Sequence, residues 1–383
     1  MTEIYVDITQ YVNNRLNTGI QRVVKEYLAR ELKQQNSLYC LFYDLTKNTF
    51  VQIPTKEMLL FLEDVSSYTL QNTLTIDIFE VKKNKKIFFD IDSVWNAPLK
   101  REVLYKQLKE NDFYIYNFIY DLIPILFPHF MYETTVKNFK PYLNAIFNYS
   151  DFVFFDSHSA MNDFTNIQNN ENTLHTIQKK VVYLGSDFRT RSTTSKIKLA
   201  TKYENLLSKK YILFVGTLEP RKNQALMLDA FDELSKTDPD LHLIFIGKIG
   251  WNVEQLVNKI NTHPLKNKRI FHLQNINDAL LKSFYQNAYI VAYLSHYEGY
   301  GLPVVESLLH GNITIVSNNS SMPEVGGIYA EYIENDSKEE IICVLEKYLK
   351  NNAFYIKKKK SIQSDYKSNE WSVFYRQIRK YLI

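Results

Sequence analysis

The stretch YILFVGTLEPRKNQALMLDAFDELSKTDPDLHLIFIG, residues 211–247, contains one complete strand–helix–strand unit. Residues 211–215 form a short apolar run, residues 224–234 repeat apolar side chains at helical spacing, and residues 241–246 form a second apolar run before Gly247. Short apolar runs that alternate with helical patterns are typical of a parallel sheet covered by helices. We therefore expect an α/β fold.

The same alternation continues along the chain. In the C-terminal half it predicts further strands at 269–273, 289–294 and 313–316 and helices at 253–261, 278–286 and 303–310. In the N-terminal half it predicts strands at 4–7, 38–43, 87–89, 113–120, 152–155 and 181–184 and helices at 20–32, 99–109, 136–147 and 159–164. We expect two doubly wound domains.

A polar stretch near the middle of the chain indicates where the two domains meet. Residues 186–202 lack a periodic apolar face and are interpreted as a linker. We place an N-terminal domain at 1–190, the linker at 191–207, a second domain at 208–365 and a C-terminal helix within 366–383. Ligands of open α/β sheets bind outside the carboxyl ends of the strands, so we expect the chemistry in the loops that follow strands.

The composition excludes several classes of protein. With 45% hydrophobic residues the chain is not disordered, and its net charge of +4 is too small to favour nucleic-acid binding. Cys40 and Cys343 are the only cysteines and lie far apart, which rules out a disulfide scaffold and a structural zinc site. The N-terminus lacks the pattern of a signal peptide, and no apolar run has the ~18 residues of a transmembrane helix. We expect a soluble, cytoplasmic protein.

Glycine is scarce and unevenly placed. Ten glycines occur in 383 residues, which is under half of the ~7% average usage, and eight of the ten fall between Gly216 and Gly327. A chain that uses so little glycine is expected to keep it where the backbone requires it. This distribution indicates tight turns near a ligand in the C-terminal half.

The sequence SHYEGYGLPVVESLLHG, residues 295–311, predicts a ligand loop in front of a helix. Gly299 lies in the loop, and Pro303 stands where the first helical position is expected, which is the place that proline tolerates best. Backbone amides at a helix N-terminus are free to bind phosphate. The amides that we expect to be free are those of Tyr300, Gly301 and Leu302.

Two glutamates, Glu298 and Glu306, stand eight residues apart around this loop. Carboxylates beside an anion site serve better as acceptors for sugar hydroxyls than as anion ligands. The alternative is that Glu306, placed in the first turn of the helix, only complements the helix dipole and that Glu298 is an ordinary loop residue.

The loop GTLEPRKN, residues 216–223, carries two adjacent cations, Arg221 and Lys222. Arginine binds two phosphate oxygens through its planar fork, and lysine supplies a point charge. The alternative is a pair of solvated surface cations. The next loop, GKIGW, offers Gly247 and Lys248 either as a wall of the same pocket or as an ordinary turn.

The N-terminal half contributes fewer candidates. Gly19 precedes a predicted helix after the first strand, so we expect it at the rim of the ligand crevice. Asp121 follows the predicted strand 113–120, where a carboxylate often takes part in chemistry but equally caps a helix or makes a turn. His129 and His158 are interpreted as structural.

These motifs together resemble the E-x7-E signature of retaining GT-B glycosyltransferases of the family-4 type. The resemblance rests on HYEGYGLPVVESLLHG, GTLEPRKN, GKIGW and NNSSMPEVGG. In the N-terminal half, IYVDIT, TGIQRVVKEYL and YDLIPILFP are similar to a subgroup that acts in bacterial O-antigen and capsule assembly. The resemblance implies a GT-B fold, with two Rossmann-like domains that face each other across a cleft and a C-terminal helix that returns to the first domain.

The resemblance also implies a role for each motif. Glu306 holds the ribose hydroxyls of a nucleotide, Glu298 contacts the donor sugar, and Arg221 with Lys222 neutralises the diphosphate. Residues 273–278 match the segment that holds the base. The expected donor site further includes Gly19, Thr217, Gly247, Lys248, Gly299, Tyr300, Gly301 and Leu302.

The chain departs from the family at two positions. Tyr120 stands before Asp121 where the family often has a histidine beside the donor sugar, and a tyrosine does not carry the same proton chemistry at neutral pH. Thr217 stands where many relatives place an arginine, which Arg221 can replace. The expected catalytic residues are Glu298, Arg221, Lys222, Asp121 and Tyr120.

The implied reaction is the retaining transfer of a hexose from a nucleoside diphosphate sugar to a glycan or lipid-linked saccharide in bacterial surface polysaccharide synthesis. It requires no cofactor and no metal. The pI of about 8.6 allows peripheral contact with the inner face of the cell membrane. Two alternatives are a non-catalytic GT-B subunit that binds sugar nucleotides or glycans, and a GT-B sugar-nucleotide epimerase.

Overall fold

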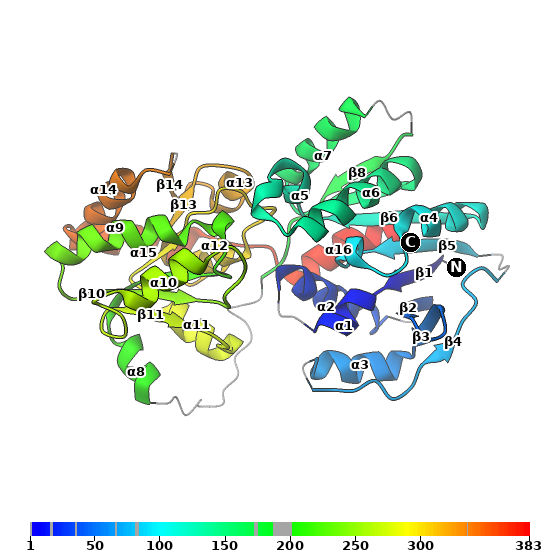
Figure 1. The fold of residues 1–383 in the computed structure, drawn as a ribbon, viewed down its shortest axis with the longest axis horizontal. Coiled ribbons are helices and arrows are strands. Elements are labelled where there is room, and N and C mark those ends of the chain that lie inside the picture. The colour runs from blue at the N-terminus through cyan, green and yellow to red at the C-terminus, as the bar shows by residue number, and fades with distance from the viewer. Residues whose placement is uncertain are drawn as a thin grey trace. The chain divides into compact units, whose positions relative to one another are not determined.

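The computed structural model describes residues 2–15, 18–34, 37–65, 67–80, 84–171, 175–186, 201–334 and 336–383. The chain forms two compact units (Figure 1). The first comprises Met1–Gly185 and Asn369–Ile383, and the second comprises Ser186–Ser368. No helix of the described residues is long and apolar enough to cross a membrane.

The first unit is built on an eight-stranded sheet with the order β4-β3-β2-β1-β5-β6-β7-β8. The strands pair in parallel, except that β3 and β4 form antiparallel pairs at one edge. Their bounds are β1 Thr2–Asp7, β2 Ser37–Asp44, β3 Thr49–Ile53, β4 Leu74–Thr75, β5 Lys85–Asp90, β6 Phe113–Ile119, β7 Phe152–Phe155 and β8 Gln178–Val181. The prediction of a strand at 181–184 is wrong, because β8 ends at Val181.

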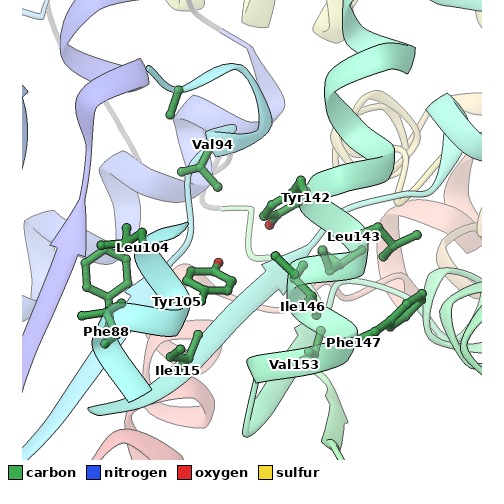
Figure 2. Packing of buried hydrophobic residues seen from close by; sticks show 14 of the residues in the cluster. Phe88, Val94, Leu104, Tyr105, Ile115, Tyr142, Leu143, Ile146, Phe147 and Val153 are labelled. Atoms are coloured by element: carbon green, nitrogen blue, oxygen red, sulfur yellow. The ribbon is translucent and has the colours of Figure 1, made fainter. Parts of the chain in front are cut away.

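Helices cover both faces of this sheet because side chains of successive strand residues point to opposite faces. Figure 2 shows Phe88 of β5 among residues of α4 and α6, including Leu104, Tyr105 and Ile146. Phe89, the next residue, instead contacts Tyr27 of α2 edge-on at 5.4 Å between ring centroids. The helices of this unit are α1 Thr9–Asn14, α2 Gly19–Glu31, α3 Thr55–Glu63, α4 Arg101–Glu110, α5 Ile123–Leu126, α6 Glu133–Tyr149, α7 His158–Asn170 and α16 Trp371–Leu382, with short 3-10 turns η1 Val94–Asn96 and η2 Pro128–Phe130.

The C-terminal helix α16 belongs to the first unit and lies beside α2 (Figure 1). The hydroxyl group of its Tyr375 donates a 2.7 Å hydrogen bond to the buried carboxylate of Glu31. Gly185 packs closely against the start of this helix, because a Cβ added to Gly185 would stand 2.3 Å from the backbone nitrogen of Trp371. These contacts fix the returning end of the chain to the first unit.

The second unit has a six-stranded parallel sheet with the order β11-β10-β9-β12-β13-β14. Counted from β9, this is the order 3-2-1-4-5-6 of the Rossmann fold, whose direction reverses between β9 and β12. The strands are β9 Lys210–Val215, β10 Leu241–Ile246, β11 Ile270–Leu273, β12 Ile290–Tyr293, β13 Ile313–Ser317 and β14 Glu331–Ile333. Ligands are expected at this reversal, outside the carboxyl ends of β9 and β12.

The helices of the second unit follow the predicted pattern closely from α9 to α12. They are α8 Thr201–Leu207, α9 Gln224–Thr237, α10 Glu254–Thr262, α11 Asp278–Asn287, α12 Leu302–Leu309, α13 Met322–Gly326, α14 Lys338–Leu349 and α15 Asn352–Asp365, with a 3-10 turn η3 Pro220–Lys222. The linker expected at 191–207 lies outside the described residues as far as 200, and its remaining part is helical, because α8 packs Leu206 against the core beside β9.

Candidate active site

The loops after β9 and β12 meet at the reversal of strand order in the second unit. The first loop ends in the turn η3, and the second leads into α12. The backbone amide of His296 donates a 2.9 Å hydrogen bond to the carbonyl oxygen of Arg221, which joins the two loops directly. The structure thus brings together the GTLEPRKN and EGYG motifs.

The loops after β9 and β10 are also joined through their backbones. The amide of Leu218 donates to the carbonyl of Lys248, and the amide of Gly250 donates to the carbonyl of Leu218, both at 2.9 Å. A Cβ on Gly247 would stand 2.0 Å from the carbonyl oxygen of Gly216, so only glycine permits this approach. The GKIGW loop is therefore a neighbour of the site, with Lys248 exposed and the Thr217 carbonyl accepting from Gln224 at 2.8 Å.

A compact charge network occupies the junction of the two loops. Lys222 places its Nζ 2.5 Å from Oε1 of Glu298 and 2.5 Å from the hydroxyl of Tyr293. Arg221 lies 2.7 Å from the same Oε1, and its other guanidinium nitrogen lies 2.5 Å from Oε1 of Glu219. Two cations and two carboxylates thus balance each other in charge, so Arg221 and Lys222 are not the solvated surface cations given above as the alternative.

Burial and charge oppose each other in this network. Burial alone would raise the pKa of Glu298, but the adjacent Arg221 and Lys222 lower it to about 2. Burial, with help from Arg221, lowers the pKa of Lys222, and Glu298 counteracts that shift. Burial beside Glu298 raises the pKa of Tyr293 well above its ordinary value. Glu298 is therefore a carboxylate at any pH near neutrality.

The backbone around Glu298 is fixed by two serines that follow β13. The amide of Glu298 donates to Oγ of Ser320 at 3.0 Å. The hydroxyl of Ser321 lies 3.1 Å from the carbonyl of Glu298 and 2.8 Å from that of Tyr300. These serines lie in the NNSSMPEVGG motif, but no role was predicted for them from the sequence.

Helix α12 begins at Leu302, one residue before the Pro303 that we expected to start it. Gly301 adopts φ 102°, a conformation that favours glycine, and a Cβ there would make the end of the flexible Met322 side chain shift, because it would stand 2.5 Å away. Within the described part of the chain, the amides of Gly301 and Leu302 have no hydrogen-bond acceptor. These two amides are open to an anion.

Glu306 lies on α12 and is 3% exposed. It is the fifth residue of the helix, so the prediction that it belongs to the first turn is wrong. Its carbonyl accepts a 2.8 Å hydrogen bond from Nδ1 of His310. Gly311, two residues after the last residue of the helix, adopts φ 73°, the left-handed conformation that commonly follows a helix C-terminus.

The remaining candidates, Gly19, Tyr120 and Asp121, belong to the first unit. Tyr120 is buried and donates a 2.6 Å hydrogen bond from its hydroxyl to the carbonyl of Ile91, and burial raises its pKa well above the ordinary value. Oδ1 of Asp121 accepts from the amide of Ile123 at 3.0 Å, which is the turn role given above as the alternative. Gly19 is the first residue of α2.

Sequence reasoning missed a buried acid–base cluster in the first unit. Arg101 donates to Asp90 at 2.7 Å and to Asp7 at 2.6 Å, at the carboxyl ends of β5 and β1. Oδ2 of Asp92 accepts from the amide of Tyr11 at 2.6 Å, and burial raises the pKa of Asp92 to about 7. The sequence contained a signal for this cluster, because Asp7 and Asp90 each stand at the end of an apolar run.

Comparisons with known proteins agree with this architecture. Residues 196–367 match the family model of glycosyl transferases group 1. The chain is 26% identical over 369 residues to the serotype-specific mannosyltransferase WbdA of Escherichia coli, which covers 91% of this chain and 42% of that protein. It is 34% identical over 143 residues to the O-antigen chain mannosyltransferase B of Escherichia coli, covering 37% of each chain.

A solved structure with the same fold is Anabaena Alr3699/HepE in complex with UDP and glucose. It has a TM-score of 0.69 at 12% identity and covers 100% of this chain and 99% of that chain. Trehalose-6-phosphate from E. coli bound with UDP-2-fluoro glucose gives 0.67 at 11% identity, with 100% and 99% covered. The chain therefore has the GT-B fold, and its residues 196–367 match the glycosyl transferases group 1 family.

Proposed function

We propose that the chain is a glycosyltransferase that moves a hexose from a nucleoside diphosphate sugar to a glycan or lipid-linked saccharide acceptor of a bacterial surface polysaccharide. The observation that carries the proposal is the junction of Arg221, Lys222 and Glu298 at the strand-order reversal of a group 1 domain. Two curated relatives are mannosyltransferases, so mannose is the first sugar to test. The chain spans 42% of the first of them.

In the proposed reaction the bond between the sugar C1 and the phosphate oxygen breaks and the acceptor oxygen bonds to C1 on the same face. The acceptor proton passes to the leaving phosphate, so the sugar keeps its configuration. Arg221, Lys222 and the amides of Gly301 and Leu302 stabilise the charge that develops on the phosphate, which is usually the largest contribution in such catalysis. Glu306 holds the ribose. Because these protein groups carry that charge, the proposed mechanism needs no metal.

A binding subunit without catalysis is the second candidate. The hydroxyl of Tyr120 is committed to the carbonyl of Ile91 and has a raised pKa, so it does not exchange protons as a histidine would. This observation favours the alternative on the acceptor side only, since the charge network of the second unit is complete. Measuring the release of nucleoside diphosphate in the presence of acceptor separates the two, and product that forms without acceptor indicates an epimerase.

The donor is best identified by a thermal-shift panel of UDP-, GDP-, dTDP- and ADP-sugars. Occupation of one site at 100 times Kd adds about 2.7 kcal/mol of stability, which is easily measured. The anomeric configuration of the first product, followed by NMR, then tests retention. No stabilisation by any of the sugar nucleotides, or a product of inverted configuration, contradicts the proposal.

We also propose that the second unit contacts an anionic membrane through α15. Lys357 and Lys360 are exposed on this helix and form no ion pair within the part of the chain that is described. Lys358 lies 3.4 Å from the carbonyl of Ile328, whose side chain is 84% exposed at the tip of an adjacent turn. Lys358 itself pairs with Glu331 at 3.0 Å, whereas Ile356, one helical turn before Lys360, is 42% exposed. Unpaired lysines beside an exposed apolar side chain suit a surface of anionic lipids.

Vesicle sedimentation tests this contact. The double variant K357E/K360E is expected to bind vesicles with anionic lipid at least about tenfold more weakly, because each lysine near the surface contributes ~1 kcal/mol. The matched control K56E/K106E changes the same charge at exposed lysines of the first unit. Equal loss in both variants, or binding to neutral vesicles alone, contradicts the assigned surface.

A further inference from the structure

The carboxylate of Glu298 stands where a phosphate oxygen of the donor is expected. A single oxygen, Oε1, lies 2.5 Å from the ammonium of Lys222 and 2.7 Å from the guanidinium of Arg221. One anionic oxygen shared by a guanidinium and an ammonium is the arrangement in which these two groups bind phosphate. The site therefore already holds an anion of its own.

The network leaves little capacity for a second anion. Arg221 also donates to the carbonyl of Tyr297 and to Glu219, each at 2.5 Å, and Lys222 is bonded to the hydroxyl of Tyr293. All of these side chains are largely buried, so water does not screen their charges well. A diphosphate that binds both cations must take the place of a carboxylate.

Of the two carboxylates, that of Glu298 is the one that a diphosphate can displace. The Glu219 carboxylate pairs with Arg221, whereas that of Glu298 bridges both cations. The backbone of Glu298 is fixed by Ser320 and Ser321, so rotation of the side chain moves the carboxylate without moving the loop. The Glu298 carboxylate can therefore move away from the two cations and be replaced by a ligand while its backbone stays in place.

We infer that the Glu298 carboxylate is an internal stand-in for the donor diphosphate, which displaces it and frees it to accept a hydroxyl of the donor sugar. The inference rests on the proposed function. It gives the site a preference for the intact donor, because a nucleoside diphosphate without sugar displaces the carboxylate and offers it no new partner. After transfer, Glu298 returns to the cations and helps to expel the product.

The first test compares the binding of UDP and GDP to the wild type, E298Q and E219Q by calorimetry at pH 7.5. We expect E298Q to bind the matching nucleoside diphosphate at least about 10-fold more tightly, because a buried negative charge that competes with it is gone. The corresponding sugar nucleotide should gain less, because the neutral amide of the E298Q side chain is a poorer acceptor for its hydroxyls than a carboxylate. E219Q, which removes the same charge from Arg221 alone, should change the two affinities in equal proportion.

A second test needs no variant. Displacement takes Glu298 away from Arg221 and Lys222 while Glu219 and Tyr293 remain, so the pKa of Glu298 rises in the complex from about 2 towards its ordinary value. The ordinary pKa of a glutamate is about 4.3, so the wild type should bind nucleoside diphosphate more tightly as the pH falls from about 6 to about 4, beyond the change seen with E298Q. The pH dependence of binding to E298Q serves as the reference, because it contains the titration of the phosphate but not that of Glu298.

The outcomes separate the inference from the proposed function. Equal or weaker binding of nucleoside diphosphate by E298Q, or a wild-type pH dependence identical to that of E298Q, overturns the inference. Tighter binding of inorganic pyrophosphate by E298Q without binding of any nucleotide supports the stand-in and refutes the proposed donor. If no form of the protein binds either anion, both are wrong.

Discussion

Replacement of Lys222 by methionine removes the charge at the centre of the proposed site and keeps the length of the side chain. At 2.5 Å and an effective dielectric constant of about 20, the attraction between Lys222 and Glu298 is ~7 kcal/mol before desolvation is subtracted. Breaking one partner of a buried pair usually costs about 3–5 kcal/mol of stability, because the other charge stays buried. Glu298 keeps Arg221 as a partner, so we expect the lower end of that range.

The same substitution should lower kcat far more than it changes donor KM. Loss of one group that stabilises the leaving phosphate typically costs ~100–1,000-fold in kcat. The assay is the release of nucleoside diphosphate under saturating donor, with chemical denaturation measured in parallel. The exposed Lys268, which precedes β11 at the amino end of the strand, provides a matched control, and K268M should leave kcat within about threefold.

The double variant K222M/E298Q separates stability from catalysis. It removes both charges, so its free energy of unfolding should recover towards the wild type while its kcat stays low. A K222M variant with kcat within about threefold of the wild type refutes the catalytic role of this cation. A double variant less stable than either single variant refutes the electrostatic reasoning.

Three further predictions concern other parts of the chain. Glu306→Ala should raise the donor KM at least ~10-fold or abolish turnover, and an unchanged KM in steady-state kinetics would remove the ribose assignment. Gly247→Ala should destabilise the protein by about 1–3 kcal/mol in denaturant titration, because its Cβ meets the backbone of Gly216, whereas Gly327→Ala meets no neighbouring atom and should cost less despite its φ of 50°. Asp92 has a pKa of about 7 in the folded protein, above its unfolded value. Its contribution to the free energy of unfolding is therefore complete in acid and is lost as the pH rises through about 4 to 7. Asp92→Asn should remove this decrease in the free energy of unfolding, which amounts to roughly 4 kcal/mol between about pH 4 and 7. The same pH dependence of the free energy of unfolding in both proteins would contradict the assignment.

The sequence predicted the second unit well because its strands are buried and apolar on both faces. The observed β10, Leu241–Ile246, has the predicted bounds, β9 begins one residue earlier than predicted, and β12 is shorter than predicted by one residue at each end. The strand β3, Thr49–Ile53, was missed because its residues mix polar and apolar side chains and its pairing depends on β2. The five-residue helix α13 was missed because so short a helix depends on tertiary packing.

The candidate residues of the site were predicted, but their pairing was not. Lys222 and Glu298 are 76 residues apart, and nothing in the local sequence says that their side chains meet. They meet because β9 and β12 are neighbours in the sheet, which becomes visible only with the strand order. Sequence alone therefore suggested two free cations where the structure has a neutral network.

This neutrality has a physical cause that bears on the whole site. Two cations held side by side in a buried site repel each other and lose their hydration, so a site that waits for a diphosphate is costly to keep empty. Glu219 offsets part of that cost permanently through Arg221, and Glu298 offsets the rest only while no donor is bound. The protein thus remains stable without substrate, and the donor that replaces Glu298 supplies the negative charge that the two cations would otherwise lack.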